Sequence, residues 1–275
     1  MASDASGVPY YDPTSPLEFA RKNLELCCEF AGRQSIACDG LVREGNPADH
    51  IVAAIRQFRV DRVLLGTRSR SRLGKLLLGS VAEQVLRSVN LPVFTVGPEA
   101  HLAVARRERV VLHATALTET SRPSAALACQ IAANQGAKLV LLHVLPPLDD
   151  PGNEMPGAFG QAGERVGRSG QLAGLDSAAL HELQVLAGET AAGCCTAIEP
   201  VVVHGIPSIE ILATAAERDA DLIVMGATDR WAFANLTRNR TIYRVLAHAR
   251  CPVLTLREQL ASLNEAERHI MGVHF

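Results

Sequence analysis

One segment, "GTRSRSRLGKLLLGSVAEQVL" (residues 66–86), combines residue types that bind phosphate. Its glycines let backbone N–H groups approach an anion, its serines offer hydroxyl donors, and its arginines add positive charge. The N-terminus of the helix that follows would add unpaired N–H groups. The same residues also suit an ordinary strand-to-helix connection. The candidate binding residues are Gly66, Arg68, Ser69, Gly79, Ser80 and Val81.

Other reactive residues lack the spacing that catalysis or metal binding needs. The nine histidines form no H-E-x-x-H pattern, and the chain has no G-x-S-x-G, G-x4-G-K-[ST] or G-x-G-x-x-G sequence. His113 and His143 fall on neighbouring predicted strands, where we expect packed core residues. The seven cysteines have no C-x-x-C spacing and are interpreted as buried or idle thiols. We therefore expect no metal site and, at most, weak ATP hydrolysis or autophosphorylation.

An internal repeat organises the elements that position the segment. The stretch from Gly45 aligns without a gap with the stretch from Gly205, an offset of 160 residues. The register holds through three further pairs, Asp61 with Asp221, Gly66 with Gly226, and Pro92 with Pro252. The chain therefore contains two related copies of one structural unit.

Each copy shows alternating helices and strands. In the first copy, helices are predicted from "SPLEFARKNLELCCEFAG", at residues 47–58 and after a cap at Ser80, and strands at residues 62–65 and in "LPVFTV". The second copy adds the strands "RERVVLHAT", "AKLVLLHVLPP" and "AIEPVVVHG", a helix at "SRPSAALACQIAANQG", a loop at residues 147–175 and a helix at 177–191. This order predicts an α/β fold with a doubly wound parallel five-stranded sheet in two tandem copies, the first incomplete.

The order of elements and the sequence "DRVLLGTRSRSRLGKLLLGSVAEQVLRSVNLPVFTV" closely resemble the universal stress protein family, whose fold is adenine-nucleotide alpha-hydrolase-like. Nucleotide-binding members carry G-x2-G-x9-G-[ST] after the fourth strand. Gly66, Ser69, Gly79 and Ser80 occupy these four positions, with Ser69 in place of a glycine. The resemblance implies a regulatory stress-response protein that binds ATP, with Mg²⁺, or another adenine nucleotide at this loop.

The second copy departs from the motif. Its equivalent positions hold Gly226, Asp229, Asn239 and Arg240, and Ala116 stands where the family places an Asp that contacts the base. An acidic residue would repel phosphate. Trp231, just past Gly226, is interpreted as a plug of this loop region rather than as a platform for a base. We therefore interpret the second copy as a structural partner that binds no nucleotide.

The first copy lacks the opening strand, helix and strand of the fold. A second chain, a rearranged sheet or a truncated start could account for the gap. The final strands "PVFTV" and "PVLTL" are apolar edges, and we expect them to pair antiparallel within the chain, with a homodimer around the incomplete copy as a second expectation. The alternative function is a structural or interaction module that acts through this dimer without nucleotide.

Composition limits the remaining possibilities. The chain has 275 residues and a net charge of −2, which argues against nucleic acid as the main partner. It shows no long apolar run and no signal-peptide layout, so we expect a soluble cytoplasmic protein without membrane partners. The expected domains are residues 1–100 (incomplete copy), 105–258 (complete copy) and a C-terminal tail at 259–275.

Overall fold

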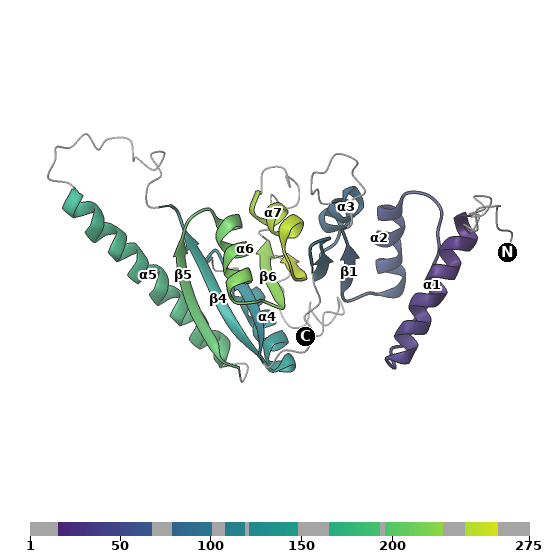
Figure 1. Ribbon diagram of the computed structural model, residues 1–275, viewed down its shortest axis with the longest axis horizontal. Coiled ribbons are helices and arrows are strands. Elements are labelled where there is room, and N and C mark those ends of the chain that lie inside the picture. The colour runs from purple at the N-terminus through teal and green to yellow at the C-terminus, as the bar shows by residue number, and fades with distance from the viewer. Residues whose placement is uncertain are drawn as a thin grey trace, which may run out of the picture. The chain divides into compact units, whose positions relative to one another are not determined.

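The structure is a computed structural model that describes residues 16–67, 79–100, 108–118, 121–147, 165–192, 196–227 and 240–257 (Figure 1). The chain forms two compact units, residues 1–50 and residues 51–275. The described helices are α1 (Pro16–Arg33), α2 (Pro47–Phe58), α3 (Ser80–Ser88), α4 (Ser121–Gln135), α5 (Arg165–Ala191), α6 (Pro207–Glu217) and α7 (Arg240–His248). The described strands are β1 (Val63–Gly66), β2 (Val93–Val96), β3 (Arg109–Ala114), β4 (Ala137–Leu145), β5 (Ile198–His204), β6 (Leu222–Ala227) and β7 (Val253–Arg257).

The second unit is built on one sheet with the order β1-β2-β7-β6-β3-β4-β5. Strands β3 to β7 form the predicted five-stranded parallel sheet of the second copy, and their order changes direction at β3. Right-handed crossovers in this order put α4 and α5 on one face and α6 and α7 on the other. The predicted doubly wound fold is therefore confirmed for the complete copy.

The two copies join where β2 pairs antiparallel with β7, which confirms the predicted pairing of "PVFTV" with "PVLTL". Phe94 lies opposite Leu254, its own equivalent at the offset of 160 residues. Arg257 of β7 strengthens the junction because its guanidinium donates to Asn90 Oδ1 and to the carbonyl oxygens of Leu86 and Arg87 at the end of α3. Within the described residues, the sheet thus has seven strands, two from the first copy and five from the second.

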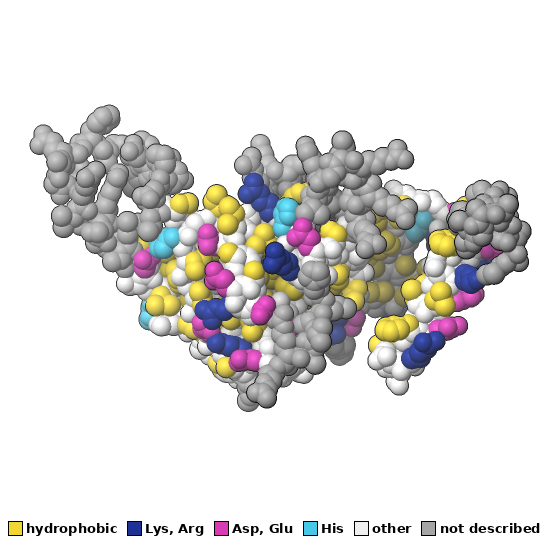
Figure 2. Space-filling model, in the orientation of Figure 1, with side chains coloured by type: hydrophobic (Ala, Val, Ile, Leu, Met, Phe, Trp, Pro, Cys, Tyr) yellow, Lys and Arg dark blue, Asp and Glu magenta, His cyan; other side chains and the backbone are white. Residues whose placement is uncertain are grey.

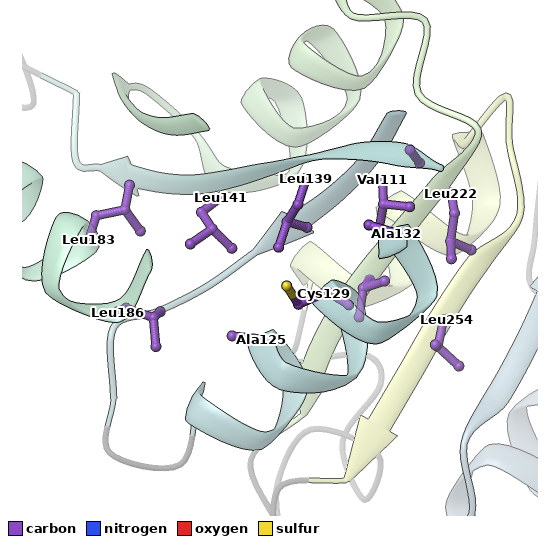
Figure 3. Packing of buried hydrophobic residues seen from close by; sticks show 13 residues of the cluster. Val111, Ala125, Cys129, Ala132, Leu139, Leu141, Leu183, Leu186, Leu222 and Leu254 are labelled. Atoms are coloured by element: carbon purple, nitrogen blue, oxygen red, sulfur yellow. The ribbon is translucent and has the colours of Figure 1, made fainter. Parts of the chain in front are cut away.

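The main hydrophobic core lies between the sheet and the helices α4 and α5 (Figure 3). Helix α4 faces the strands with Ala125, Ala128, Cys129 and Ala132, which are all buried. Such small side chains let a helix lie close to a sheet. Leucines and valines from β3, β4, β6 and β7 fill the other side of this layer: Val111, Leu139, Leu141, Leu222, Val224 and Leu254.

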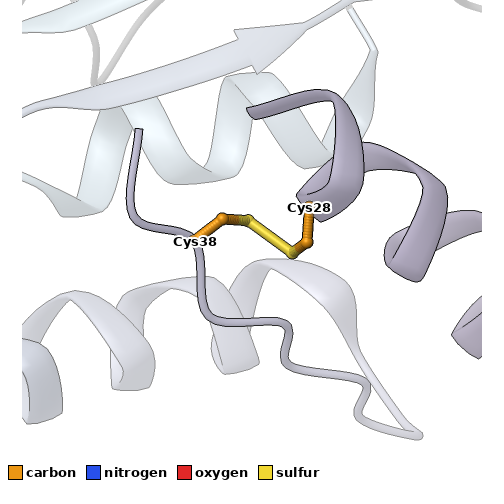
Figure 4. Close-up of a disulfide and its surroundings, with 2 residues drawn as sticks. All are labelled: Cys28 and Cys38. Atoms are coloured by element: carbon orange, nitrogen blue, oxygen red, sulfur yellow. A yellow bond between two sulfur atoms is a disulfide. The ribbon is translucent and has the colours of Figure 1, made fainter. Parts of the chain in front are cut away.

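The first unit contains α1 and the segment that follows it. A disulfide joins Cys28 of α1 to Cys38, with 5.3 Å between their Cα atoms (Figure 4). The prediction of idle thiols is wrong for these two cysteines, because the chain folds back after α1 and brings them together. It is also wrong for Cys129 of α4, which is disulfide-bonded as well. Cys27 and Cys251 are free thiols.

Two further differences from the sequence-based expectations are local. Helix α5 begins at Arg165, inside the predicted loop of residues 147–175. The glycines of this stretch suggested a loop, but glycine lowers helix propensity without preventing a helix. Residues 38–44, equivalent to β5 by the repeat, form no strand, since the described part of the first copy offers them no neighbouring strand to pair with.

Two glycines keep their special backbone in both copies. Gly45 has φ of 123° and its equivalent Gly205 has φ of 150°, values that side chains rarely allow. Each glycine comes just before a helix, α2 or α6. The repeat therefore preserves the same turn in both copies.

Candidate functional site

The loop that the sequence singled out is described only at its two ends. Gly66 is the exposed last residue of β1, and Gly79, Ser80 and Val81 stand at the start of α3. Arg68 and Ser69 lie outside the described residues, as do Asp229, Trp231 and Asn239 of the second copy. The structure therefore places the strand end and the helix start, and phosphate binding at this loop stays a prediction.

The helix start corrects one detail of the motif. Gly79, not Ser80, is the N-cap of α3, and Ser80 is the first residue of the helix. In the described part of the chain, no side-chain hydrogen bond caps this helix. A Cβ added to Gly66 or to Gly79 would meet no atom within 4 Å, so among the described residues neither glycine is required by a close neighbour.

A cavity of about 300 Å³ lies in the complete copy, at the carboxyl ends of β3, β4 and β6. This is the point where the strand order changes direction, at which open α/β sheets bind their ligands. The first turns of α4, α6 and α7 also reach its wall, so three helix N-termini surround one space. The lining residues are Ala114, Thr115, Ala116, Ser121, Ser124, Leu142, His143, Val144, Pro207, Ile211, Met225, Gly226, Thr241 and Ile242.

Hydrogen bonds fix the polar part of this wall. Nδ1 of His143 donates to the carbonyl oxygen of Thr115 at 2.9 Å, because a carbonyl can only accept. The Thr115 hydroxyl accepts the N–H of Leu117 at 3.1 Å, and the Ser124 hydroxyl donates to the carbonyl oxygen of Ser121 at 2.9 Å. These bonds hold the end of β3, the end of β4 and the first turn of α4 in one arrangement.

His113 lies beneath the cavity as a fully buried core residue, as the sequence predicted. Its Nδ1 donates to the carbonyl oxygen of Val224 at 3.1 Å, and Ser124 Oγ lies 3.4 Å from its Nε2. Burial lowers the pKa of His113 to about 4, and the bond to Val224 opposes this shift only in part. His113 is therefore neutral near pH 7.

The free thiol at Cys251 is not poised for chemistry. It lies buried two residues before β7, and burial raises its pKa to about 12. A thiolate, which is the nucleophilic form, is therefore scarce at neutral pH. Cys251 is a packing residue, as predicted.

The surface of the second copy carries both signs of charge. Figure 2 shows basic and acidic side chains interspersed among the coloured residues of the visible face, without a broad patch of one sign among them. Within the described ranges, no group of three histidine, cysteine or acidic side chains could hold a metal ion. None of the described helices is long and apolar enough to cross a membrane.

Sequence reasoning missed the cavity because it judged the second copy by the phosphate motif alone. Thr115, His143 and Thr241 line the wall, yet they belong to β3's end, to β4 and to α7. The sequence held one signal that could have found these three residues, because each stands at or near a strand end or a helix start. Ala116, noted as the replacement of an Asp, does lie on the wall, and it is exposed.

Comparison with known proteins agrees with this geometry. The universal stress protein family matches residues 3–97 and 108–257. A universal stress protein of Methanocaldococcus jannaschii is 40% identical over 53 residues, which is 19% of this chain and 31% of that protein. Stress response protein NhaX of Bacillus subtilis is 34% identical over 55 residues, 20% of this chain and 33% of that protein. The matched stretch thus spans about a third of the length of each of these curated relatives.

Solved structures share the fold over most of the chain. A universal stress protein from Archaeoglobus fulgidus has a TM-score of 0.60 at 20% identity, covering 87% of this chain and 76% of its own. A putative universal stress protein from Pseudomonas aeruginosa has a TM-score of 0.58 at 16% identity, covering 88% and 83%. Because the family match takes in both copies, the chain belongs to the universal stress protein family.

Proposed function

We propose that this chain is a regulatory stress-response protein that binds an adenine nucleotide in the cavity of its complete copy. The observation that carries the proposal is the cavity itself, where three helix N-termini meet the carboxyl ends of β3, β4 and β6. Helix N-termini present unpaired N–H groups and partial positive charge, which favour a phosphate. The cytoplasmic location stays a prediction from the sequence.

The wall suits a ligand that is partly apolar and partly anionic. Leu142, Ile211 and Met225 supply apolar surface for a flat base, while Thr115 and Thr241 supply hydroxyl groups. The volume of about 300 Å³ stands at the lower end of the usual range of roughly 300–1,000 Å³ for ligand sites. A nucleoside monophosphate therefore fits this volume better than a triphosphate.

ATP with Mg²⁺ is the ligand that the sequence resemblance implies, at the loop from Gly66 to Ser80. Among the described residues, the lining of the cavity includes no carboxylate, so these residues would leave Mg²⁺ to be held by the phosphates. The role of the chain's own residues is then to bind and orient the nucleotide. The loop from Gly66 to Ser80 is the second candidate site, with Arg68, Ser69 and Gly79 as its predicted contacts.

Calorimetric titration with AMP and with ATP plus Mg²⁺ tests the proposal. Ala116→Phe would fill the cavity from an exposed position, and Gly79→Glu would place an acid at the other loop. Ala191→Phe, on an exposed position of α5, is the matched control for added bulk. We expect at least about tenfold weaker binding in Ala116→Phe and unchanged binding in the control.

The two candidate sites give different results. Loss of binding in Gly79→Glu, with binding kept in Ala116→Phe, would move the site to the first copy. No heat with either nucleotide at high micromolar concentration would refute nucleotide binding by this chain.

A second candidate function is protein interaction through the incomplete first copy, with a homodimer as its simplest form. The exposure of 73% at Leu64, an apolar residue in the middle of β1, favours this function. Sedimentation at micromolar concentration tests the homodimer, and a single monomeric species would refute it.

A further inference from the structure

The pairing of β2 with β7 relates the two copies by an approximate twofold axis perpendicular to the sheet. Val93 lies opposite Thr255 and Thr95 lies opposite Val253, while Phe94 and Leu254 pair at the centre. The axis therefore exchanges the pair Val93–Thr255 with the pair Thr95–Val253, and Phe94 faces its own equivalent, Leu254. On this basis β1 in the first copy corresponds to β6 in the second.

The backbone hydrogen bonds of β1 and β6 agree with this correspondence. The N–H of Val63 donates to the carbonyl oxygen of Pro92 at 3.0 Å, and the N–H of Ile223 donates to that of Pro252 at 3.0 Å. Because successive residues of a strand point their N–H groups to opposite sides, the N–H of Leu64 faces away from β2. On the equivalent side of the second copy, β6 pairs with β3.

The environments of the two strands differ sharply. Val224 of β6 is completely buried beneath α4, whereas its equivalent Leu64 is 73% exposed. Leu64 pairs with Phe94, and Phe94 pairs with Leu254, so all three side chains lie on one face of the sheet. Among the described residues, β1 ends the sheet on this side.

An aspartate stands just before β1 and just before β6, and the one before β6 shows which hydrogen bonds a neighbouring strand receives. In the second copy, the N–H of Asp221 donates to the carbonyl oxygen of Val110, and its carboxylate accepts the N–H of Val110, both at 2.8 Å. These two bonds hold Val110, near the start of β3, against Asp221. Asp61 is the equivalent residue next to β1 and is exposed.

We propose that this open edge docks a strand-then-helix segment of a second polypeptide. The incoming strand runs parallel to β1, as β3 runs parallel to β6, and Asp61 binds the N–H and C=O of its first residues. The helix that follows carries small residues and covers Leu64 and Phe94, as the alanines of α4 cover Val224.

A second copy of this chain fits the edge less well. Two β1 strands can pair antiparallel and satisfy the Leu64 backbone, but that pairing brings no helix over the Leu64 side chain. A four-residue strand also buries far less than the roughly 1,200 Å² of stable interfaces. The proposal rests on the second candidate function, protein interaction, and is independent of nucleotide binding.

A synthetic peptide with the sequence of residues 108–135, which form β3 and α4 in this chain, is the probe. We expect it to bind the full chain one-to-one in fluorescence anisotropy and to slow hydrogen exchange at the Leu64 amide. Asp61→Ala and Leu64→Lys should each weaken binding about tenfold or more. The controls Asp49→Ala and Leu175→Lys change residues of the same types that are also exposed but lie elsewhere, and they should leave binding unchanged.

A peptide with Val110→Pro lacks the N–H that Asp61 would accept and should bind about tenfold more weakly. Equal binding of the two peptides, or binding without protection of Leu64, would overturn the proposal. Protection of Leu64 that rises with chain concentration in the absence of peptide would overturn it in favour of the homodimer. No protection under either condition would refute the interaction function as well, while nucleotide titration would be unaffected.

Discussion

The buried histidine beneath the cavity predicts a loss of stability in mild acid. His113 is fully buried, its Nδ1 donates to Val224, and burial lowers its pKa to about 4. In the unfolded chain its pKa would be near 6.5. Between these values the unfolded chain binds a proton that the folded chain does not bind, so stability rises with pH across this window.

The size of the effect follows from the two pKa values. A separation of two to three pKa units corresponds to about 3 kcal/mol in total, at 1.36 kcal/mol per unit. Most of this free energy of unfolding is present at pH 7, and about 2 kcal/mol is lost on going to pH 5. Below about pH 4 the folded state also binds the proton, and this contribution levels off.

Urea denaturation at pH 7 and pH 5 measures the effect. His113→Asn keeps a donor near Val224 but does not titrate, so its change in unfolding free energy between the two pH values should be about 2 kcal/mol smaller than that of the native chain. His181→Gln, on the exposed side of α5, is the control and should keep the native pH dependence. Equal pH dependence in the native chain and His113→Asn would refute the reasoning.

Three further changes test the fold. Leu254→Ala removes a completely buried side chain at the junction of the copies, and urea denaturation should show a loss of about 2–5 kcal/mol in unfolding free energy. Leu64→Ala removes an exposed side chain and should lower the unfolding free energy by less than about 0.5 kcal/mol. Equal losses in the two variants would show that β1 is covered. Arg257→Met removes the hydrogen bonds to Leu86, Arg87 and Asn90 and should cost about 1–2 kcal/mol, with faster hydrogen exchange in the last turn of α3. Cys28→Ser opens a disulfide with a sequence separation of 10, which should destabilise the first unit by about 2–3 kcal/mol. Amide hydrogen exchange in α1 should become faster, and unchanged exchange there would count against a structural role for the disulfide.

Much of the fold was predictable because its signals are local or repeated. Helix α2 has the predicted bounds, and the turn glycines Gly45 and Gly205 stand at equivalent positions. The pairing of β2 with β7 followed from two apolar edge strands of the same pattern. Helix α5 was predicted too short, since glycines spaced along a helix resemble a loop when their packing is unknown.

The site was less predictable because it depends on distant residues. The loop from Gly66 to Ser80 has a readable motif, but its partners would be strands that are not among the described residues of the first copy. The cavity has no motif, and its walls come from three strands and the starts of three helices that only the sheet order brings together. Residue types alone therefore directed attention to the first copy.

The sequence by itself determined the repeat, the family and the elements of each copy, because these depend on periodicity and on backbone preferences of nearby residues. Only the tertiary structure decided the environment of each element. A short apolar run such as that of β1 is typical of a strand buried on both faces, yet Leu64 is exposed while Val224 is buried. The physical reason is that burial belongs to neighbours in space: β6 has β3 and α4 beside it, and β1 has β2 alone among the described strands.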